Sequence, residues 1–264
     1  MVKIYEVMNV MEEIAPKKLA ENWDNPGLLV GNPQNEASKI LVALDANERV
    51  IKKAIEIKAE LIVTHHPIIF KPLKKIRSDL SDGKKLFNLI QNNISVFSAH
   101  TNLDSAKGGV NDILAKKLEL NNVNPFIIHD NDEIGLGRIG KLEKEISIES
   151  FIEIVKNNLN LSYVKIVRSP NNRTIKKVAL CGGAGAEFIE KASFLGADVY
   201  VTGDVKYHEG DLAKSLNINL IDAGHFATEY PIVNELANIL KVAFENKDVE
   251  IFEDVEGEDV FTLV

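Results

Sequence analysis

The chain has 264 residues but only one cysteine, Cys181. A single cysteine cannot form a disulfide within the chain, and it excludes a metal cluster held by several thiolates of this chain. No apolar run reaches the roughly 20 residues that a membrane-spanning helix requires. Acidic and amide residues interrupt the first 14 positions, where a signal peptide would need an apolar stretch. These absences predict a cytoplasmic protein that does not cross a membrane.

The chain also has no excess of basic residues. It contains 31 Lys and Arg residues against 39 Asp and Glu residues, which gives a net charge of −8. Proteins that bind duplex nucleic acid regardless of its sequence carry a basic excess, so the composition disfavours nucleic acid as the main partner. The 45% of apolar and 27% of charged residues are typical of a soluble globular protein. The length suits one large α/β domain or two lobes.

Helical and strand patterns alternate along the chain. Helices are expected at 4–14, 47–58, 83–92, 109–119, 148–158, 185–195, 206–215 and 225–243, and strands at 39–44, 61–64, 94–99, 137–142, 163–168, 174–181, 198–202 and 218–222. A connector is expected around 121–135. This alternation predicts an α/β fold with largely parallel or mixed sheets that helices flank.

The two halves of the chain share a repeated pattern. Residues 42–44 and 59–64 read VAL and AELIVT, and residues 178–180 and 197–202 read VAL and ADVYVT. The spacing in the second half is two residues longer. We expect the glycine-rich turn Gly182–Gly185 to accommodate this difference.

A second match follows each of these strand patterns. The sequence AHxxxD at 99–104 is echoed by AGHxxxE at 223–229, so each half ends a strand with a histidine and then a carboxylate. We therefore predict two mutually similar lobes that face each other, with the metal site between them. The first lobe is expected to comprise residues 1–125 and 225–264, and the second residues 126–224.

Two adjacent histidines, His65 and His66, directly follow the predicted strand 61–64 and precede Pro67. The carboxyl ends of strands border the ligand crevice of an open α/β sheet. Neighbouring side chains of a regular strand point to opposite faces, so these imidazoles can converge only where pairing stops. Pro67 is consistent with such a stop. Considered alone, the pair is more readily explained by partly buried histidines bonded to backbone groups than by a metal site.

His225 and Glu229 form a second candidate ligand pair. They lie four residues apart at the start of the predicted helix 225–243, so both can project from one helical face. Imidazole together with carboxylate suits Zn, Mn or Fe better than Ca or Mg. An isolated pair at this spacing is nevertheless usually a surface contact.

Asp104 lies in a polar segment after the predicted strand 94–99, where a capping turn is the simpler explanation for the segment alone. Taken together, the three segments offer three imidazoles and two carboxylates at strand ends. Five side chains are too few to close two coordination spheres, which leaves positions for substrate. Two divalent ions against two carboxylates leave a charge of about +2, which favours a small anionic ligand.

Five motifs in a fixed order carry a resemblance to a known family. THHP at 64–67, SAHTNLD at 98–104, TGDVKYHE at 202–209, DAGHFATE at 222–229 and NWDNPGLLVG at 22–31 closely resemble the Nif-three-like family. Members of that family often bear the name GTP cyclohydrolase I type 2 homologue. The resemblance covers most of the chain, and the combination of GHFATE with THHP is specific.

The resemblance implies a set of site residues. Two divalent metal ions per chain, of Zn, Mn or Fe, would be bound by His65, His66, Asp104, His225 and Glu229. His100 matches a histidine beside that centre and is a candidate catalytic proton carrier or extra ligand. The resemblance also implies that the two α/β lobes are interlaced and that the chain forms a toroidal homohexamer. The domain that some longer members insert between the lobes is missing between Pro125 and Gly135.

We therefore predict a dinuclear-metal-dependent hydrolase, which by resemblance opens the guanine imidazole ring of GTP. A metal-dependent phosphoesterase needs the same ligands, and a non-catalytic metal-binding or partner-binding protein is a further alternative. His208 is expected either to contact a metal ligand or the substrate, or to be an ordinary histidine on a helix surface. The four cations at 71–77 form either a solvated loop or a phosphate-steering element. Trp23 is expected to pack or to lie in an interface.

Overall fold

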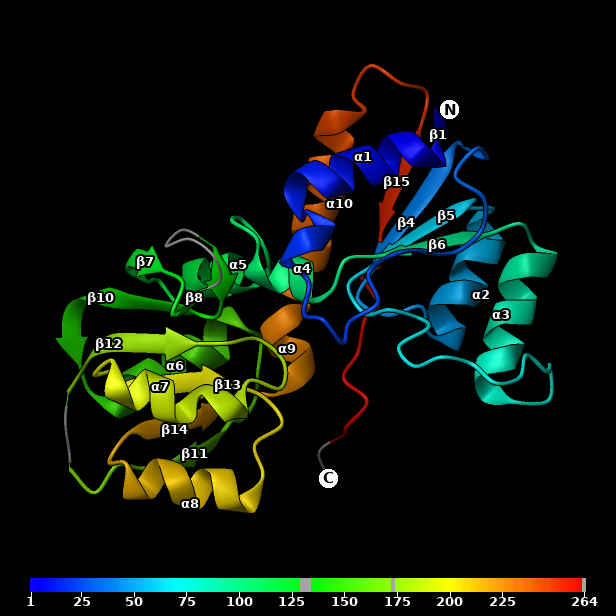
Figure 1. Ribbon diagram of the computed structural model, residues 1–264. Helices are drawn as coiled ribbons and strands as arrows, with labels where there is room; N and C mark the ends of the chain where they lie inside the picture. Colours follow the sequence, from blue (N-terminus) through cyan, green and yellow to red (C-terminus); the bar gives the residue numbers. More distant parts are fainter. Residues whose placement is uncertain (129–133, 172–173, 263–264) are drawn as a thin grey trace. The chain divides into compact units, whose positions relative to one another are not determined.

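The structure is a computed structural model that describes residues 1–128, 134–171 and 174–262. Its helices and strands form two compact units (Figure 1). Within the described ranges, no helix is long and apolar enough to cross a membrane.

The chain enters each unit more than once. Unit 1 comprises Met1–Leu103 and Ile232–Gly257, and unit 2 comprises Asp104–Pro231 and the segment from Glu258 onward. The chain is therefore interlaced between two units, as predicted.

Unit 1 contains a five-stranded mixed sheet. In spatial order its strands are β15 (Glu250–Glu253), β4 (Lys39–Ala43), β5 (Leu61–Thr64), β6 (Ser95–Ser98) and β2 (Gly27–Val30). The first four pair in parallel, and β2 pairs antiparallel with β6. A separate short pair joins β1 (Val2–Lys3) to β3 (Glu36–Ala37). The consecutive parallel strands β4, β5 and β6 end at the same edge of the sheet, so residues that follow them can meet there.

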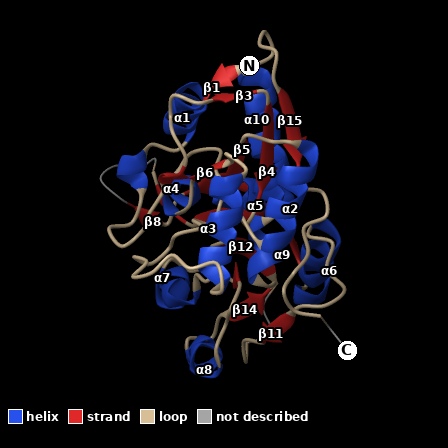
Figure 2. Ribbon diagram, turned by 90° about the vertical axis from the view of Figure 1, so that its right-hand side faces the viewer, coloured by secondary structure: helices blue, strands red, loops and turns tan. Residues whose placement is uncertain are grey.

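Helices cover both faces of this sheet. They are α1 (Ile4–Ile14), α2 (Glu48–Ile57), α3 (Ser81–Gln91) and α10 (Pro231–Ala243), with a 3-10 turn η1 at Lys17–Leu19. Figures 1 and 2 show α2 and α3 side by side on one face, and α1 and α10 on the other. Asn47 caps α2 as its sequence position predicts, because its side chain accepts a hydrogen bond from the Val50 amide. Leu41 and Ala43 of β4 pack against the buried face of α2.

Unit 2 contains a six-stranded mixed sheet. In spatial order its strands are β11 (Lys165–Val167), β14 (Asn219–Asp222), β13 (Val199–Thr202), β12 (Ile175–Leu180), β10 (Arg138–Ile146) and β7 (Asn121–Asn124). The strands β12, β13 and β14 pair in parallel, and the other pairings are antiparallel. Its helices are α5 (Val110–Lys117), α6 (Ile148–Asn158), α7 (Ile189–Phe194) and α8 (Tyr207–Ser215), with a 3-10 turn η2 at Ala186–Phe188.

Two apolar clusters lie on opposite faces of this sheet. Val178, Leu180 and Val201 pack with α5 and α6, whereas Ala179 and Tyr200 pack with α7 and α8. Alternate residues of each strand thus enter different clusters, as the two-residue period of a strand requires. The run of apolar residues in β12 and β13 reflects this burial on both faces.

The boundary between the units differs from the predicted one. Residues 104–125, 225–231 and the segment from Glu258 onward belong to unit 2 and not to the first unit. Within unit 2, α5 packs on β10 and β12. The expected connector at 121–135 contains β7 and a short antiparallel pair, β8 (Ile127–Ile128) with β9 (Gly135–Leu136). Residues 129–133 of that connector lie outside the described residues.

The strand register corrects the alignment of the two repeats. In unit 1, Leu61 of β5 pairs with Ile40 of β4, and in unit 2 Val199 of β13 pairs with Val178 of β12. Val178 is therefore equivalent to Ile40 and not to Val42, as the matching VAL triplets had suggested. With this register the two repeats have equal spacing, so the glycine-rich turn has no length difference to accommodate.

An acidic residue at the start of the second strand of each repeat supports this register. The Glu60 carboxylate accepts the Lys39 amide at 2.9 Å, and the Asp198 carboxylate accepts the Lys177 amide at 2.8 Å. In return, the Glu60 amide donates to the Lys39 carbonyl and the Asp198 amide to the Lys177 carbonyl. The same reciprocal pair of bonds therefore closes the helical crossover of both repeats.

A short helix follows the third strand of each repeat. These helices are α4 (Thr101–Ser105) and α9 (His225–Glu229). The long helix expected at 225–243 is thus two helices, since α10 begins at Pro231. Proline has no amide hydrogen to continue the ladder of α9, and its fixed φ favours the first position of a new helix.

Candidate metal-binding residues

The end of β5 explains how two adjacent histidines can serve one site. The last ladder pairs of β5 are at Thr64, so His65 and His66 lie beyond the regular pleat. The Thr64 hydroxyl lies 2.8 Å from both the His66 carbonyl and the Ser98 hydroxyl. The His66 amide donates to the Leu44 carbonyl at 3.0 Å. These bonds fix the turn that brings both imidazoles to the same edge of the sheet.

Three imidazoles of unit 1 form a cluster at this edge. His65, His66 and His100 each offer one ring nitrogen, and these atoms lie within 4.8 Å of one another. The ring centroids are 5.0 to 5.7 Å apart. His65 is fully buried, and the other two rings are partly exposed. The expectation that the two neighbouring histidines converge is therefore confirmed within unit 1.

The Nδ1 atom of each of these histidines is held by an acceptor. The pairs are His65 with the Ala99 carbonyl at 2.9 Å, His66 with Asp45 at 2.8 Å and His100 with Asp24 at 2.8 Å. Since a carbonyl or ionised carboxylate can only accept, Nδ1 carries the proton in each ring. Nε2 is then the nitrogen whose lone pair can coordinate a metal. This arrangement is typical of metal-binding histidines, whose other nitrogen is oriented by a carboxylate or carbonyl.

Asp24 accepts several hydrogen bonds. Its buried carboxylate accepts from His100, from the Thr101 amide at 3.0 Å and from the Thr101 hydroxyl at 2.5 Å. Burial alone would raise the pKa of Asp24, but the hydrogen bonds from His100 and Thr101 outweigh it and lower the pKa to about 2. Asp24 therefore remains a carboxylate that orients both His100 and the start of α4.

Unit 2 also contains a histidine that is anchored in this way. His225 directs Nδ1 to the Asp204 carboxylate at 2.8 Å, and its Nε2 lies 3.1 Å from Oε2 of Glu229. The two residues are the first and last of α9, so the helical spacing places them on one face as predicted. The Glu229 side chain is buried, whereas His225 is partly exposed. An imidazole nitrogen and a carboxylate oxygen thus face each other at a distance that a shared cation can bridge.

A glycine turn packs directly against these two side chains. Gly183 has φ of +62°, and a Cβ atom there would lie 2.1 Å from Oε1 of Glu229 and 3.3 Å from Nε2 of His225. Its amide donates to the Thr228 hydroxyl at 2.9 Å, and the Gly203 amide donates to its carbonyl at 2.8 Å. The turn after β12 is therefore a strand-to-helix turn, as expected, whose missing side chain leaves room for the carboxylate.

Asp104 lies near Glu229 in unit 2. One carboxylate oxygen of Asp104 and one of Glu229 are within 4.8 Å of each other. The Asp104 carbonyl accepts from the Asn111 side chain at 3.0 Å, and Asn111 in turn accepts the Gly182 amide at 2.9 Å. Burial, together with the charges of Asp104 and Glu229, raises the pKa of the Cys181 thiol. Two carboxylates this close repel each other, and a bound cation would relieve that repulsion.

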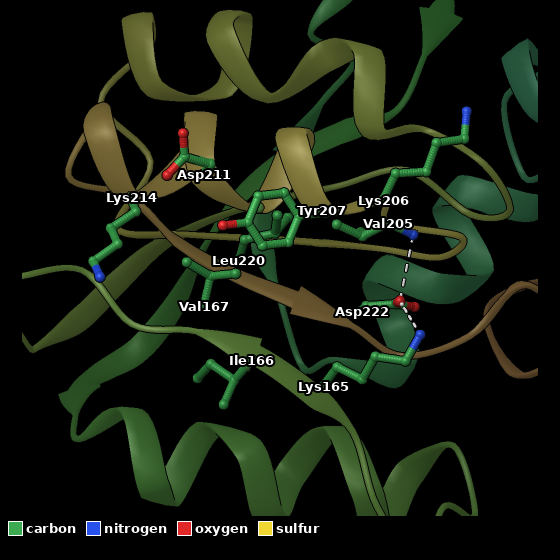
Figure 3. Close-up of a pocket in the computed structure, with 11 residues that line it drawn as sticks. Lys165, Ile166, Val167, Val205, Lys206, Tyr207, Asp211, Lys214, Leu220 and Asp222 are labelled. Atoms are coloured by element: carbon green, nitrogen blue, oxygen red, sulfur yellow. Dashed lines mark hydrogen bonds and ion pairs between the residues drawn. The ribbon is translucent and has the colours of Figure 1, made fainter.

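His208 lies elsewhere on unit 2. It is exposed on α8, and its ring contacts Tyr207 with centroids 5.3 Å apart. Beside α8, a pocket of about 360 Å³ opens over Val167 and Leu220 (Figure 3). Lys165 lies at one end of this pocket, where it forms an ion pair of 3.0 Å with Asp222. His208 is not one of the residues that line the pocket.

The expected site residues thus fall into two clusters. Unit 1 brings together His65, His66 and His100, and unit 2 brings together Asp104, His225 and Glu229. Sequence reasoning missed the residues that orient them, which are Asp24, Asp45, Asp204 and Asn111. Asp24 and Asp204 lie in the motifs NWDNPG and TGDVKYHE, but a motif does not indicate which histidine each carboxylate meets.

Known proteins resemble this chain over its whole length. The model of the family Duf34/NIF3 (NGG1p interacting factor 3) matches residues 2–256. A Clostridium perfringens protein named GTP cyclohydrolase 1 type 2 homolog is 39% identical over 99% of this chain and 100% of its own length. The crystal structure of a Bacillus cereus protein related to NIF3 superposes with a TM-score of 0.92, at 28% identity over 100% of this chain and 99% of that one.

A further solved structure is also similar to this chain. HcgD from Methanocaldococcus jannaschii, in its reduced form, is 36% identical, with a TM-score of 0.82 over 95% of this chain and 97% of that one. The motifs, the fold and the family model agree, so the resemblance inferred from the sequence is confirmed. The chain belongs to the Duf34/NIF3 (NGG1p interacting factor 3) family.

Proposed function

We propose that this protein is a metal-dependent hydrolase that binds two divalent ions through His65, His66, Asp104, His225 and Glu229. The observation that carries the proposal is the orientation of the histidines. His65, His66 and His100 hold Nδ1 against a carbonyl or carboxylate and so offer Nε2, while His225 holds Nδ1 against Asp204 and directs Nε2 to Glu229. Histidines that serve only packing need no such uniform orientation, whereas metal ligands do.

The donor set fits Zn, Mn or Fe, since it consists of imidazole nitrogens and carboxylate oxygens. Two such ions supply Lewis-acid chemistry and make water a stronger nucleophile near neutral pH. Asp24 holds His100 with its proton on Nδ1, so Nε2 of His100 can accept a proton and return it. Asp45 and Asp204 fix the rings of His66 and His225 in the same way.

The substrate class follows from charge and from the names of relatives. Two divalent ions outweigh the charges of Asp104 and Glu229, so we propose a small anionic substrate. Curated relatives from several bacteria bear the name GTP cyclohydrolase 1 type 2 homolog. We therefore propose hydrolytic opening of the guanine imidazole ring of GTP as the first reaction to test, with phosphoester hydrolysis as the comparison.

Elemental analysis of the purified protein tests the metal centre. After loading with Mn, Fe or Zn, the wild type is expected to retain about two ions per chain, and His65→Ala and Glu229→Ala to lose metal. The matched control is His208→Ala, which removes an exposed histidine that lies outside both clusters and should leave the metal content unchanged. A wild type that holds no metal after loading would refute the proposed centre.

Turnover then separates a catalyst from a binding protein. The metal-loaded protein is incubated with GTP and with a chromogenic phosphoester, and products are followed by chromatography and absorbance. A hydrolase turns over one of them and loses activity in Glu229→Ala. If the protein binds metal but turns over neither compound, the hydrolase part of the proposal is wrong and a binding function replaces it.

A further inference from the structure

Two large aromatic side chains are exposed next to the histidine cluster of unit 1. Trp23 is 59% exposed and Phe70 is 46% exposed. Their ring centroids are 5.7 Å apart, and each lies about as far from the ring of His100, at 6.1 Å for Trp23 and 6.0 Å for Phe70. The three rings meet edge to face, with interplanar angles of 67° to 82°. Much of the Trp23 ring is thus not packed within this chain.

The position of this aromatic pair is fixed from both sides. The Asn25 side chain donates to the Ile69 carbonyl at 2.7 Å, which joins the loop of Trp23 to the loop of Phe70. Asp24, the neighbour of Trp23, is held by His100 and Thr101. The two rings are therefore kept beside His100 by hydrogen bonds of adjacent residues, not by burial of the rings themselves. A pair that served only the core would bury its apolar surface.

A basic loop continues directly from Phe70. Lys71, Lys74 and Lys75 are exposed, and within the described ranges no ion pair involves any of them. Arg77 is different, because it pairs with Asp79 at 2.6 Å. In a protein of net charge −8, three lysines without carboxylate partners next to an aromatic pair favour a ligand that is both aromatic and anionic.

We propose that Trp23 and Phe70 form a subsite that holds the planar ring of an aromatic anion beside His100, while the loop of Lys71, Lys74 and Lys75 attracts its anionic group. This subsite deepens the proposed function, on which it rests, because it specifies a planar heteroaromatic substrate. An exposed aromatic face attracts such a ring through stacking and apolar contact. A compound with the same phosphate but no ring lacks that contact.

Trp23 reports directly on this subsite because it is the only tryptophan of the chain. The test is a titration of tryptophan fluorescence in the full-length protein, with and without loaded metal. The probes are guanosine 5′-monophosphate, guanosine and ribose 5-phosphate, which carry ring and phosphate, ring alone and phosphate alone. We expect the nucleotide to quench Trp23 with the lowest Kd, guanosine to quench more weakly, and ribose 5-phosphate to leave the emission unchanged. Added salt should raise the Kd of the nucleotide but not that of guanosine.

Phe70→Leu is the matched variant, since it removes the ring, keeps an apolar side chain and retains Trp23. Loss of one stacking partner is expected to raise the Kd of the nucleotide about fivefold. Phe194→Leu, at an 84% exposed phenylalanine of unit 2, is the control and should bind like the wild type. Equal binding of ribose 5-phosphate and the nucleotide, or an unchanged Kd in Phe70→Leu, overturns the subsite. Metal content is measured on the same samples. A wild-type protein that holds no metal, but whose Trp23 fluorescence the nucleotide still quenches, overturns the proposed function and not the subsite.

Discussion

Gly183→Ala is expected to weaken metal binding without removing any ligand. At Gly183 a Cβ atom would lie 2.1 Å from Oε1 of Glu229, whereas ordinary contacts begin at 3.4 Å. The carboxylate must therefore retreat by about 1.3 Å, the difference between these two distances. Changes that displace a ligand in this way typically cost roughly 10- to 100-fold in metal affinity.

Backbone strain has to be separated from this displacement. Gly183 has φ of +62°, and an alanine in that left-handed region costs roughly 1–2 kcal/mol of stability. Gly196 has φ of +74° but nothing within 4 Å of its Cβ position. Gly196→Ala, also in unit 2, is thus a control with the same backbone strain and no displaced carboxylate.

The assay compares stability and metal content in the two variants. Urea unfolding of the metal-free proteins should show a similar loss for both, of roughly 1–2 kcal/mol. Elemental analysis after metal loading should show metal in Gly196→Ala and a large loss in Gly183→Ala. Normal metal affinity in Gly183→Ala, at the expected loss of stability, would contradict the assignment of Glu229 as a ligand.

Three further predictions concern the carboxylate that anchors His100, a buried arginine and the buried cysteine. The pKa of Asp24 is lowered from 3.8 to about 2, so its ionised form stabilises the fold above about pH 4 and this contribution is lost as the pH falls toward 2. Asp24→Asn should lower the free energy of unfolding by about 2 kcal/mol at pH 7. Urea unfolding in the presence of a chelator, at pH 7 and at low pH, should show that the difference between variant and wild type disappears in acid. Arg138 is buried against Asp112 and the carbonyls of Gly135 and Ala106, so Arg138→Met should cost about 3–5 kcal/mol in the same assay. Arg168→Met, in an exposed pair with Glu149, is the control and should leave the free energy of unfolding nearly unchanged. Burial raises the pKa of Cys181, so a thiol reagent should leave the native protein unmodified and react once per chain in denaturant.

The candidate ligands could be found from the sequence because strand ends are marked in it. The apolar run at 61–64 ends at a histidine pair and a proline, and this local signal places His65 and His66 where ladder pairing stops. Helical spacing likewise gives the shared face of His225 and Glu229. Each inference depends only on residues that are near one another in the chain.

The orienting residues could not be found in the same way. Asp24 meets His100 across 76 positions of sequence, and Asp204 meets His225 across 21. Nothing in the local pattern distinguishes such a carboxylate from the many that lie in solvated loops. Only the strand order and register, which result from long-range pairing, decide which loops meet at one edge of a sheet.

Long-range pairing also explains two wrong or missing predictions, which are the alignment of the repeat and the strand β15 near the C-terminal end. The shared triplet VAL aligned Val42 with Val178. In the structure Val178 pairs with Val199, and the equivalent pair in unit 1 is Ile40 with Leu61. A two-residue slip keeps the same side chains on each face, so the apolar pattern cannot detect it. The strand β15 escaped prediction because its sequence EIFE has little apolar signal, and it pairs with β4 from the far end of the chain.

The corrected register shows which site residues of the two units occupy equivalent positions. Thr64 and Thr202 end equivalent strands, so the positions that follow them, His65 and His66 in unit 1, correspond to Gly203 and Asp204 in unit 2. Where unit 1 presents an imidazole at the second of these positions, unit 2 presents the carboxylate that holds the imidazole of His225. The fold thus repeats while the candidate ligands differ, since three imidazoles gather in unit 1 and one imidazole lies with two carboxylates in unit 2. Replacing the unit 2 pair by two histidines would therefore not create a second copy of the unit 1 cluster, because it would remove the anchor of His225.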